Sequence, residues 1–178
     1  MGHEEHREHA PSTVGISIIT VSDTRTEVDD ASGKLARELL EKSGHIVRDY
    51  RIVKDEPAQV VELLRALRKR DDLRAVILSG GTGISQRDRT YETVSSLLDR
   101  TIDGFGEIFR VLSFQEIGPA AMLSRAVAGT YRGLVVFSMP GSLDAVRLAM
   151  RRLILPEIGH AAGLLAPRAA RGRHERHA

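Results

Sequence analysis

The sequence predicts an α/β protein, a three-layer α/β/α sandwich in which helices cover both faces of a mostly parallel central sheet. Short apolar runs with the composition of buried strands alternate along the chain with segments of helical periodicity. That alternation is typical of parallel strands joined by helical crossovers. Several of the apolar runs end in loops that carry glycine, hydroxyl groups or carboxylates. Open sheets of this kind bind ligands beyond the carboxyl ends of their strands, so these loops are the leading site candidates.

Five segments are predicted to be strands. They are rich in β-branched residues or consist of short apolar runs, which fit a buried sheet. In chain order they are residues 14–21, 45–53, 75–78, 126–131 and 134–137. The fourth is predicted to be an edge strand or one arm of a hairpin.

Two helices are predicted in the first half of the chain from apolar residues that recur every three to four positions. The first follows three candidate N-cap residues, Asp29, Asp30 and Ser32, and ends just before Gly44. The second carries Pro57 in its first turn, where proline needs no hydrogen-bond partner.

The second half of the chain is predicted to hold further helical segments over residues 90–98 and 107–116 and a short helical turn over 120–123. Ser142 is placed to cap a last helix, whose apolar positions again follow helical spacing. We expect Pro156 to kink or divide that helix, because proline removes a backbone hydrogen bond and clashes with the preceding turn.

The composition is that of a soluble globular protein and excludes several classes. The 178 residues are 42% hydrophobic and 28% charged, which fits one domain with a sizeable core. The net charge of +2 and an aromatic content of 4% argue against nucleic-acid binding. Because the chain has no cysteine, disulfides, thiol catalysis and cysteine-bound zinc are excluded. No apolar run approaches membrane-spanning length and no signal peptide is recognisable, so we expect a cytoplasmic protein that does not contact membranes.

Both ends of the chain read as polar arms around a single domain over residues 13–166. Residues 1–12 include histidines at positions 3, 6 and 9, and residues 167–178 are rich in arginine. Neither arm has an accompanying apolar face, so both are predicted to be disordered. Metal binding by the histidines and polyanion binding by the arginines are the alternatives.

A glycine-rich loop follows the strand predicted over residues 75–78. It begins Ser79-Gly80-Gly81-Thr82-Gly83, and Arg87, Asp88 and Arg89 follow shortly afterwards. Glycine allows a sharp turn and lets a ligand approach the backbone amides. The loop lacks the lysine of a Walker loop, and Gln86 stands where a dinucleotide-binding fingerprint has its third glycine. It is either a plain tight turn or an anion site, and the adjacent charged residues favour the anion site.

Four loops are predicted to share one edge of the sheet, because each follows a strand. They cover residues 22–26, 54–56, 79–92 and 138–142. Together they bring carboxylates, hydroxyl groups and glycine amides towards one crevice. Asp55 stands just ahead of a helix, so by itself it reads as a capping residue or as compensation for the helix dipole.

Four motifs stand out in the sequence: Ser79-Gly80-Gly81-Thr82-Gly83, Arg87-Asp88-Arg89-Thr90, Asp103-Gly104-Phe105-Gly106-Glu107 and Pro140-Gly141-Ser142. Together they resemble the MoaB/MogA family of molybdenum cofactor biosynthesis proteins. The resemblance extends from about Val14 to Leu165. Residues 116–126 are more similar to the MoaB branch. Tyr91 departs from the pattern, because many members of the family have proline there.

The resemblance implies adenylylation of molybdopterin by magnesium-bound ATP, with Asp55 and Asp88 as the functional carboxylates. Asp88, with Asp55 as a second candidate, would hold Mg²⁺. The remaining implied binding residues come from the same loops: Ser22, Asp23, Thr24, Ser79, Gly80, Gly81, Thr82, Gly83, Arg87, Thr90, Glu92, Pro140, Gly141 and Ser142. The family also implies a homotrimer or hexamer and contacts with other cofactor-biosynthesis proteins. The alternative function is a non-catalytic molybdopterin carrier or a scaffold protein of the same pathway.

Overall fold

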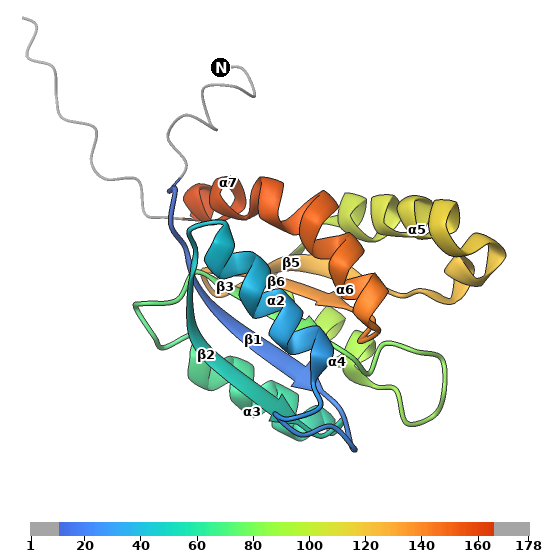
Figure 1. Cartoon of the computed structure of the whole chain (residues 1–178). Helices are drawn as coiled ribbons and strands as arrows, with labels where there is room; N and C mark the ends of the chain where they lie inside the picture. Colours follow the sequence, from blue (N-terminus) through green and yellow to red (C-terminus); the bar gives the residue numbers. More distant parts are fainter. Residues whose placement is uncertain (1–10, 166–178) are drawn as a thin grey trace, which may run out of the picture.

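The structure, a computed structural model, describes residues 11–165 of the chain. The histidines at positions 3, 6 and 9 and the basic segment 167–178 lie outside the described residues, so the predictions for both arms remain predictions (Figure 1).

The described residues form a mixed six-stranded sheet with the strand order β2-β1-β3-β6-β5-β4. The strands are β1 (Gly15–Val21), β2 (Ile46–Val53), β3 (Ala75–Ser79), β4 (Arg100–Thr101), β5 (Val127–Tyr131) and β6 (Leu134–Met139). The pairs β1–β2, β1–β3 and β3–β6 are parallel, whereas β5 is antiparallel to both β6 and β4. The predicted mostly parallel sheet is therefore confirmed.

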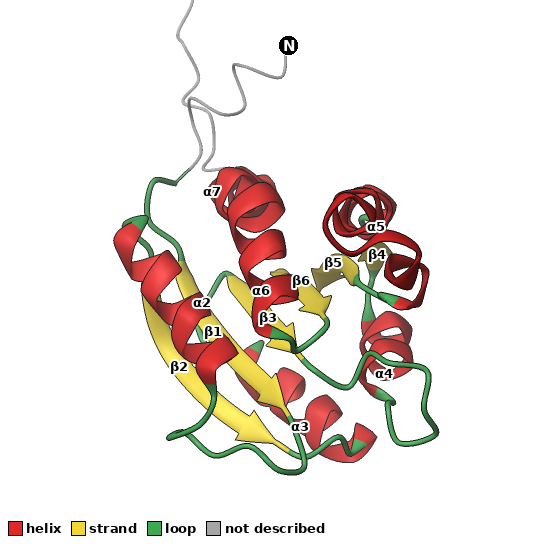
Figure 2. Cartoon of the chain, turned by 45° about the vertical axis from the view of Figure 1, so that its right-hand side comes forward, coloured by secondary structure: helices red, strands yellow, loops and turns green. Residues whose placement is uncertain are grey.

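Helices cover both faces of this sheet (Figures 1 and 2). One face carries α2 (Ala31–Lys42), α5 (Asp103–Ile117), α6 (Leu143–Ala149) and α7 (Leu155–Leu165). The other face carries α3 (Pro57–Leu67) and α4 (Thr90–Leu97). The three-layer α/β/α sandwich predicted from the alternation of strands and helices is confirmed.

The two helical layers explain why the central strands are buried on both faces and are largely apolar. Along β1, Ile16 and Ile18 belong to the core on one face of the sheet, and Ile19 and Val21 belong to the core on the other face. Successive side chains of a strand point to opposite faces, so a strand covered on both sides favours apolar residues at most positions. The strands β3 and β6 divide their side chains between the two cores in the same way.

Strand β5 is a hairpin arm and lies inside the sheet, so its alternative prediction as an edge strand is wrong. It pairs with β6 on one side and with β4 on the other. Strand β4 is only two residues long, Arg100 and Thr101, and was not predicted. Two residues carry no readable alternation, and Gly129 opposite them leaves room for the β4 backbone, since an added Cβ would lie 2.2 Å from the Arg100 carbonyl oxygen.

Two helix boundaries also differ from the prediction. Helix α5 begins at Asp103 rather than at residue 107, and Gly106 inside it allows close approach to Ala126, whose carbonyl oxygen would lie 2.5 Å from an added Cβ. Pro156 does not divide the last helix. A π-helical segment, Met150–Ile154, joins α6 to α7 and places the proline in the first turn of α7. The wider π turn accommodates the proline ring without a break.

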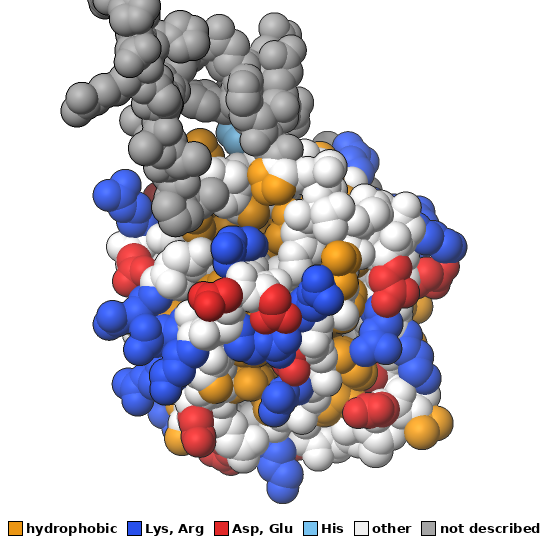
Figure 3. Space-filling model, turned by 90° about the vertical axis from the view of Figure 1, so that its left-hand side faces the viewer, with side chains coloured by type: hydrophobic (Ala, Val, Ile, Leu, Met, Phe, Trp, Pro, Cys, Tyr) orange, Lys and Arg blue, Asp and Glu red, His pale blue; other side chains and the backbone are white. Residues whose placement is uncertain are grey.

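The exposed edge strand β2 is lined with alternating charge. Asp49 forms ion pairs with Arg51 at 3.1 Å and with Arg70 at 3.6 Å. Arg70 also forms an ion pair with Asp72 at 2.7 Å. Figure 3 shows basic and acidic side chains interspersed on this side of the molecule. Charged side chains of this kind discourage edge-to-edge strand pairing.

None of the helices in residues 11–165 has both the length and the apolar character needed to cross a membrane.

Candidate functional site

The four predicted loops come together at the carboxyl ends of β1, β2, β3 and β6. The backbone itself links them in pairs: Ser22 N–H donates to the Val53 carbonyl at 2.8 Å, and Gly80 N–H donates to the Met139 carbonyl at 3.0 Å. Figure 1 shows the ends of β1 and β2 and the long loop before α4 on the same side of the sheet. The crevice expected beyond the strand ends is therefore where these loops meet.

Gly80 and Gly81 have to be glycines because of what surrounds them. Both have positive φ angles, 108° and 63°. A Cβ on Gly80 would lie 2.1 Å from the Val21 carbonyl oxygen, and a Cβ on Gly81 would lie 2.2 Å from Oδ2 of Asp55. The left-handed backbone and the close approach both exclude a side chain. The chain can therefore turn directly from β3 over the end of β1 and against Asp55.

Asp55 lies at the base of the site and is almost fully hydrogen-bonded. It is 5% exposed, its Oδ1 accepts from Thr90 Oγ1 at 3.0 Å, and both of its oxygens accept from Arg89 N–H at 3.3 Å. Thr90 N–H in turn donates to the Gly81 carbonyl at 2.9 Å. Asp55 therefore ties the start of α4 to the glycine turn.

This arrangement corrects the capping prediction for Asp55. The N-cap of α3 is Glu56, which makes no side-chain capping bond. Asp55 instead accepts from the amide of Arg89, the N-cap residue of α4, and from the hydroxyl of Thr90, the first residue of α4. The sequence pointed to the helix that follows Asp55 because capping is usually local. Burial, together with the nearby charge of Asp88, raises the pKa of the Asp55 carboxyl above its ordinary value.

Asp88 lies at the rim of the site and keeps part of its carboxylate open. Its Oδ2 accepts from Ser85 N–H at 3.1 Å and from Ser85 Oγ at 2.6 Å. Its Oδ1 receives no hydrogen bond from any residue that the structure describes. The carboxylate rests against Gly83, since a Cβ there would lie 2.6 Å from Oδ2. Asp88 is half-buried, so one oxygen remains available to a ligand.

Arg87 joins three of the four loops through ion pairs. Its guanidinium contacts both oxygens of Asp23, at 2.6 and 2.9 Å, and Glu56 Oε1 at 2.7 Å. The hydrogen bond from Arg87 lowers the pKa of Asp23 to about 2. Asp23 also accepts from Asp55 N–H at 3.3 Å. Arg87 was predicted to favour an anion site, but its charge is already matched by two carboxylates, so its observed role is to hold the loops together.

The hydroxyl groups of the remaining loops mostly shape the backbone. Ser22 Oγ accepts from Thr24 N–H at 3.3 Å and from Arg25 N–H at 3.1 Å, which closes the turn after β1. Ser142 caps α6 by accepting from Ala145 N–H at 3.3 Å, as predicted. The loop of Pro140 and Gly141 lies beside the glycine turn, because a Cβ on Gly141 would lie 3.1 Å from Gly80 Cα.

Arg125 belongs to the site but was not predicted. It precedes β5, and its Nε donates to the Thr82 carbonyl at 2.9 Å while Nη2 donates to the Gly83 carbonyl at 2.5 Å. It also pairs with Glu92 and stacks over the Tyr91 ring, with 4.7 Å from Cζ to the ring centroid. A single arginine after a short 3₁₀ turn has no local signal that points to a loop more than forty residues away.

The donors present suit one magnesium ion only in part. Within residues 11–165 no group of three or more His, Cys, Asp or Glu side chains is placed to hold a metal. Mg²⁺ in phosphoryl-transfer sites is commonly held by one or two carboxylates together with substrate phosphates. Asp88, with its open oxygen, fits that role. Asp55 does not, because both of its oxygens are engaged by Arg89 and Thr90.

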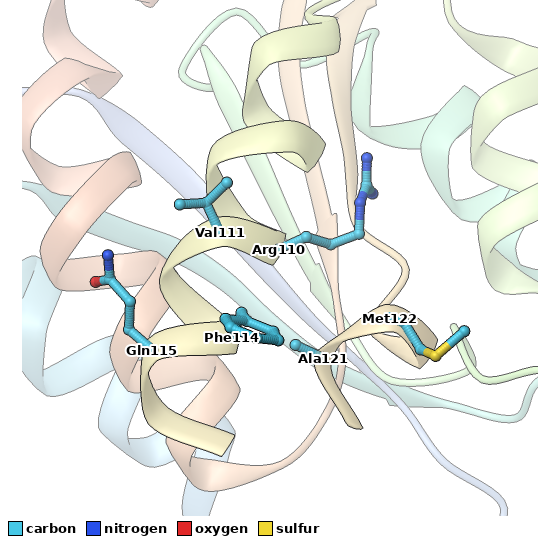
Figure 4. A pocket seen from close by; sticks show the side chains of 6 residues that line it. All are labelled: Arg110, Val111, Phe114, Gln115, Ala121 and Met122. Atoms are coloured by element: carbon cyan, nitrogen blue, oxygen red, sulfur yellow. The ribbon is translucent and has the colours of Figure 1, made fainter. Parts of the chain in front are cut away.

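One hollow adjoins these residues, and a second lies elsewhere on the surface. One, of about 420 Å³, is bordered by Asp88, Arg89 and Glu92 and continues between α3 and α4. The second, of about 350 Å³, lies between α5 and the 3₁₀ turn Gly118–Leu123 and is lined by Val111, Phe114 and Met122 among others (Figure 4). The first is bordered mainly by polar and charged residues and adjoins the open carboxylate, whereas the second is apolar and contains none of the predicted site residues.

Comparisons with known proteins agree with this architecture. Residues 17–160 match the family model described as "Probable molybdopterin binding domain". The chain is 57% identical to molybdenum cofactor biosynthesis protein B of Halalkalibacterium halodurans, over 90% of this chain and 95% of the relative. It is 48% identical to the Bacillus subtilis protein of the same name, with the same coverage.

Solved structures are similar as well. A crystal structure of a molybdenum cofactor biosynthesis protein B has a TM-score of 0.85 at 54% identity and covers 88% of this chain and 98% of its own. The tungsten cofactor synthesizing protein MoaB of Pyrococcus furiosus has a TM-score of 0.76 at 41% identity, covering 85% of this chain and 96% of its own. A MogA structure has a TM-score of 0.75 at 28% identity, with coverages of 85% and 99%. The chain therefore belongs to the MoaB/MogA family of molybdenum cofactor biosynthesis proteins.

Proposed function

We propose that this protein acts in molybdenum cofactor biosynthesis, where it binds molybdopterin and adenylylates it with Mg-ATP. Relatives at 57% and 48% identity are named for that pathway, and the matching family model is described as a molybdopterin-binding domain. The observation that carries the proposal is the meeting of Asp88 with Gly83 and of Asp55 with Gly81 in one loop system. Such a site combines backbone amides for phosphate with an open carboxylate for a cation.

In the proposed reaction the terminal phosphate of molybdopterin attacks the α-phosphorus of ATP. A new bond forms between that phosphate oxygen and the α-phosphorus. The bond from the α-phosphorus to the bridging oxygen of the β-phosphate breaks, and pyrophosphate leaves with the electron pair. Catalysis of such a transfer consists mainly of positioning and charge neutralisation, so the site needs few reactive side chains.

Each part of the site has a defined task in this proposal. Thr82 and the amides of the glycine turn bind phosphate oxygens, because backbone N–H groups approached through glycines suit an anion. Asp23, Thr24 and Ser142 line the pocket for the pterin or the nucleotide. Asp55 fixes the start of α4 and the glycine turn relative to each other.

Asp88 is the residue that would hold Mg²⁺. The ion would supply charge neutralisation for the phosphates of ATP. Ser85 fixes one side of the Asp88 carboxylate through two hydrogen bonds, which leaves the other oxygen directed for a ligand. Asp55 contributes indirectly through the adjacent Arg89 amide.

The test is turnover of molybdopterin with ATP and Mg²⁺, measured as adenylylated molybdopterin and released pyrophosphate. Replacing Asp88 by Asn should lower turnover by about a hundredfold, because one ligand of the cation loses its charge. Asp144→Asn, a change of an exposed aspartate on α6, is the matched control and should leave turnover unchanged. Full turnover by the folded Asp88→Asn variant would contradict the role of Asp88.

Calorimetric titration with molybdopterin and with Mg-ATP separates the enzyme from a carrier. Binding of both substrates with product formation supports the adenylyltransferase. Binding of molybdopterin without any product would instead assign the chain to the carrier function in the same pathway.

We further propose that the protein assembles as a homotrimer or as a hexamer of two trimers. Helix α5 and the following 3₁₀ turn expose several large apolar side chains, among them Val111, Phe114 and Met122, and clustered apolar side chains at a surface are typical of protein–protein contacts (Figure 4). Light scattering after size-exclusion chromatography should give about three or six times the chain mass of 19.6 kDa. A monomer mass would contradict the proposal.

A further inference from the structure

Arg125 holds two consecutive carbonyl groups of the glycine-rich loop with one side chain. Its Nε donates to the Thr82 carbonyl at 2.9 Å, and its Nη2 donates to the Gly83 carbonyl at 2.5 Å. Arg125 reaches this loop from the segment before β5, 43 positions from Thr82 along the chain. The orientation of these two peptide groups is therefore set from a distant part of the chain.

The orientation of the carbonyls fixes the orientation of the amides that follow them. No peptide bond among the described residues is cis. In a planar trans peptide the C=O and the next N–H point in opposite directions. With the Thr82 and Gly83 carbonyls facing Arg125, the N–H groups of Gly83 and Ile84 face away from it.

These two amides are available to a ligand. Neither donates a hydrogen bond to any residue within the described part of the chain, whereas the next amide, of Ser85, donates to Asp88 at 3.1 Å. Ile84 is 70% exposed, so the segment lies at the protein surface, where a ligand can reach it. Adjacent N–H groups that point the same way form a concave anion-binding arrangement.

Arg125 itself is not placed to bind the anion. Glu92 forms an ion pair with its guanidinium group. The Tyr91 ring packs against the plane of that group, with 4.7 Å from Arg125 Cζ to the ring centroid. The position at which this sequence departs from the family pattern, Tyr91, thus supports the arginine. All five donors of an arginine lie in one plane, which allows it to reach the two carbonyls and the carboxylate together.

We propose that Arg125 is a positioning residue, which turns the Gly83 and Ile84 amides toward a phosphate group of the substrate. This inference rests on the proposed function, because it names how the phosphate is held in that same site. Lysine at position 125 would keep the charge opposite Glu92, but a single ammonium group would not hold both carbonyls in a fixed plane.

The experiment is an NMR titration of the full ¹⁵N-labelled chain with inorganic pyrophosphate as the probe. In the unchanged protein the Gly83 and Ile84 amide signals should shift on titration. Arg125→Lys should weaken pyrophosphate binding by about tenfold and remove the selective shift of these two signals. Arg147→Lys, which alters an exposed arginine paired with Asp144 on α6, is the matched control and should bind as the unchanged protein does.

A rescue experiment distinguishes positioning from a general structural role. Millimolar guanidinium chloride should restore much of the pyrophosphate affinity of Arg125→Ala, whereas sodium chloride at equal ionic strength should not. If Arg125→Ala does not fold, Tyr91→Leu replaces it, and this loss of the stacking surface should weaken binding by about threefold.

The outcomes separate this inference from the proposed function. If Gly83 and Ile84 do not respond to pyrophosphate in the unchanged protein, the phosphate-binding role of the glycine loop is wrong. If they respond there and equally in Arg125→Lys, the loop keeps its role and the positioning role of Arg125 is overturned.

Discussion

The base and the rim of the site use the same side chain, an aspartate beside a glycine, in opposite ways. At the base, Asp55 is buried against Gly81 and its oxygens are taken up by Thr90 and Arg89. At the rim, Asp88 rests against Gly83 with one oxygen open. A buried carboxylate whose oxygens both accept hydrogen bonds is a structural anchor, whereas a half-buried one with an open oxygen can still bind a ligand.

The comparison shows that two carboxylates of one site need not share one task. The family resemblance pairs Asp55 with Asp88 as functional residues, and the geometry gives them different parts. Stability should depend chiefly on the base, and ligand binding chiefly on the rim. Substitutions at matched positions can break or sharpen this distinction.

The largest effect is expected for Gly81→Ala at the base. The added Cβ would lie 2.2 Å from Asp55 Oδ2 and 2.4 Å from Thr90 Oγ1, in a backbone with φ of 63°. We expect a loss of about 3 kcal/mol in the free energy of unfolding, seen as a fall of about 10 °C in Tm by calorimetry. Gly44→Ala is the control, because Gly44 follows the end of α2 with a positive φ of 81° and no heavy atom lies within 4 Å of its added Cβ. It should cost only about 1 kcal/mol, and equal losses in both would refute the packing argument.

The next effect is expected for Gly83→Ala at the rim, and it should fall on binding. The added Cβ would lie 2.6 Å from Asp88 Oδ2, but Asp88 can swing outwards, so Tm should change little. Displacing the carboxylate should weaken Mg-ATP binding by about tenfold, as measured by titration calorimetry. Gly104→Ala, with no heavy atom within 4 Å of the new Cβ, serves as the control. Unchanged affinity in Gly83→Ala would remove Asp88 from the ligand site.

Asp55→Asn is expected to have a smaller effect, and to raise Tm rather than lower it. Burial raises the pKa of the Asp55 carboxyl, so its contribution to stability is complete below its ordinary pKa and is lost as the pH rises through the raised value. Asparagine keeps an acceptor for Thr90 without a buried charge. At pH 7 the variant should therefore have a Tm about 2 °C above that of the unchanged protein. This difference should vanish below a pH of about 4. A lower Tm at pH 7 would show that the charge itself strengthens the anchor.

The smallest effect is expected for the exposed ion pair of Asp23 with Arg87. Their hydrogen bond lowers the Asp23 pKa from 3.8 to about 2, so its stabilisation is present above the ordinary pKa and is lost as the pH falls toward 2. Asp23→Asn should lower Tm at pH 7 by about 1 °C, and less in high salt, because exposed pairs are weak and screened. The gap from the unchanged protein should close as the pH falls toward 2. A gap that persists there would mean that Asp23 acts through its hydrogen bond to Asp55 rather than through its charge.

The sequence placed most of the fold correctly because the signals involved are local. Apolar runs with turn residues at their ends located five of the six strands, and Pro57 and Ser142 marked helix starts within a residue. Strand β4 is too short to show alternation, and Pro156 sits after a π-helical segment that its neighbouring residues do not announce.

The sequence by itself determined which loops meet, since parallel strands bring their carboxyl ends to one edge of the sheet. It also marked Asp55, Asp88 and the glycine turn. Only the tertiary structure decided what each group contacts. Asp55 accepts a hydrogen bond from the first residue of α4, and Arg125 donates to the loop carbonyls. The charge of Arg87 is matched by Asp23 and Glu56. These partners lie more than thirty positions apart, and such pairings depend on how the layers pack rather than on neighbouring residues.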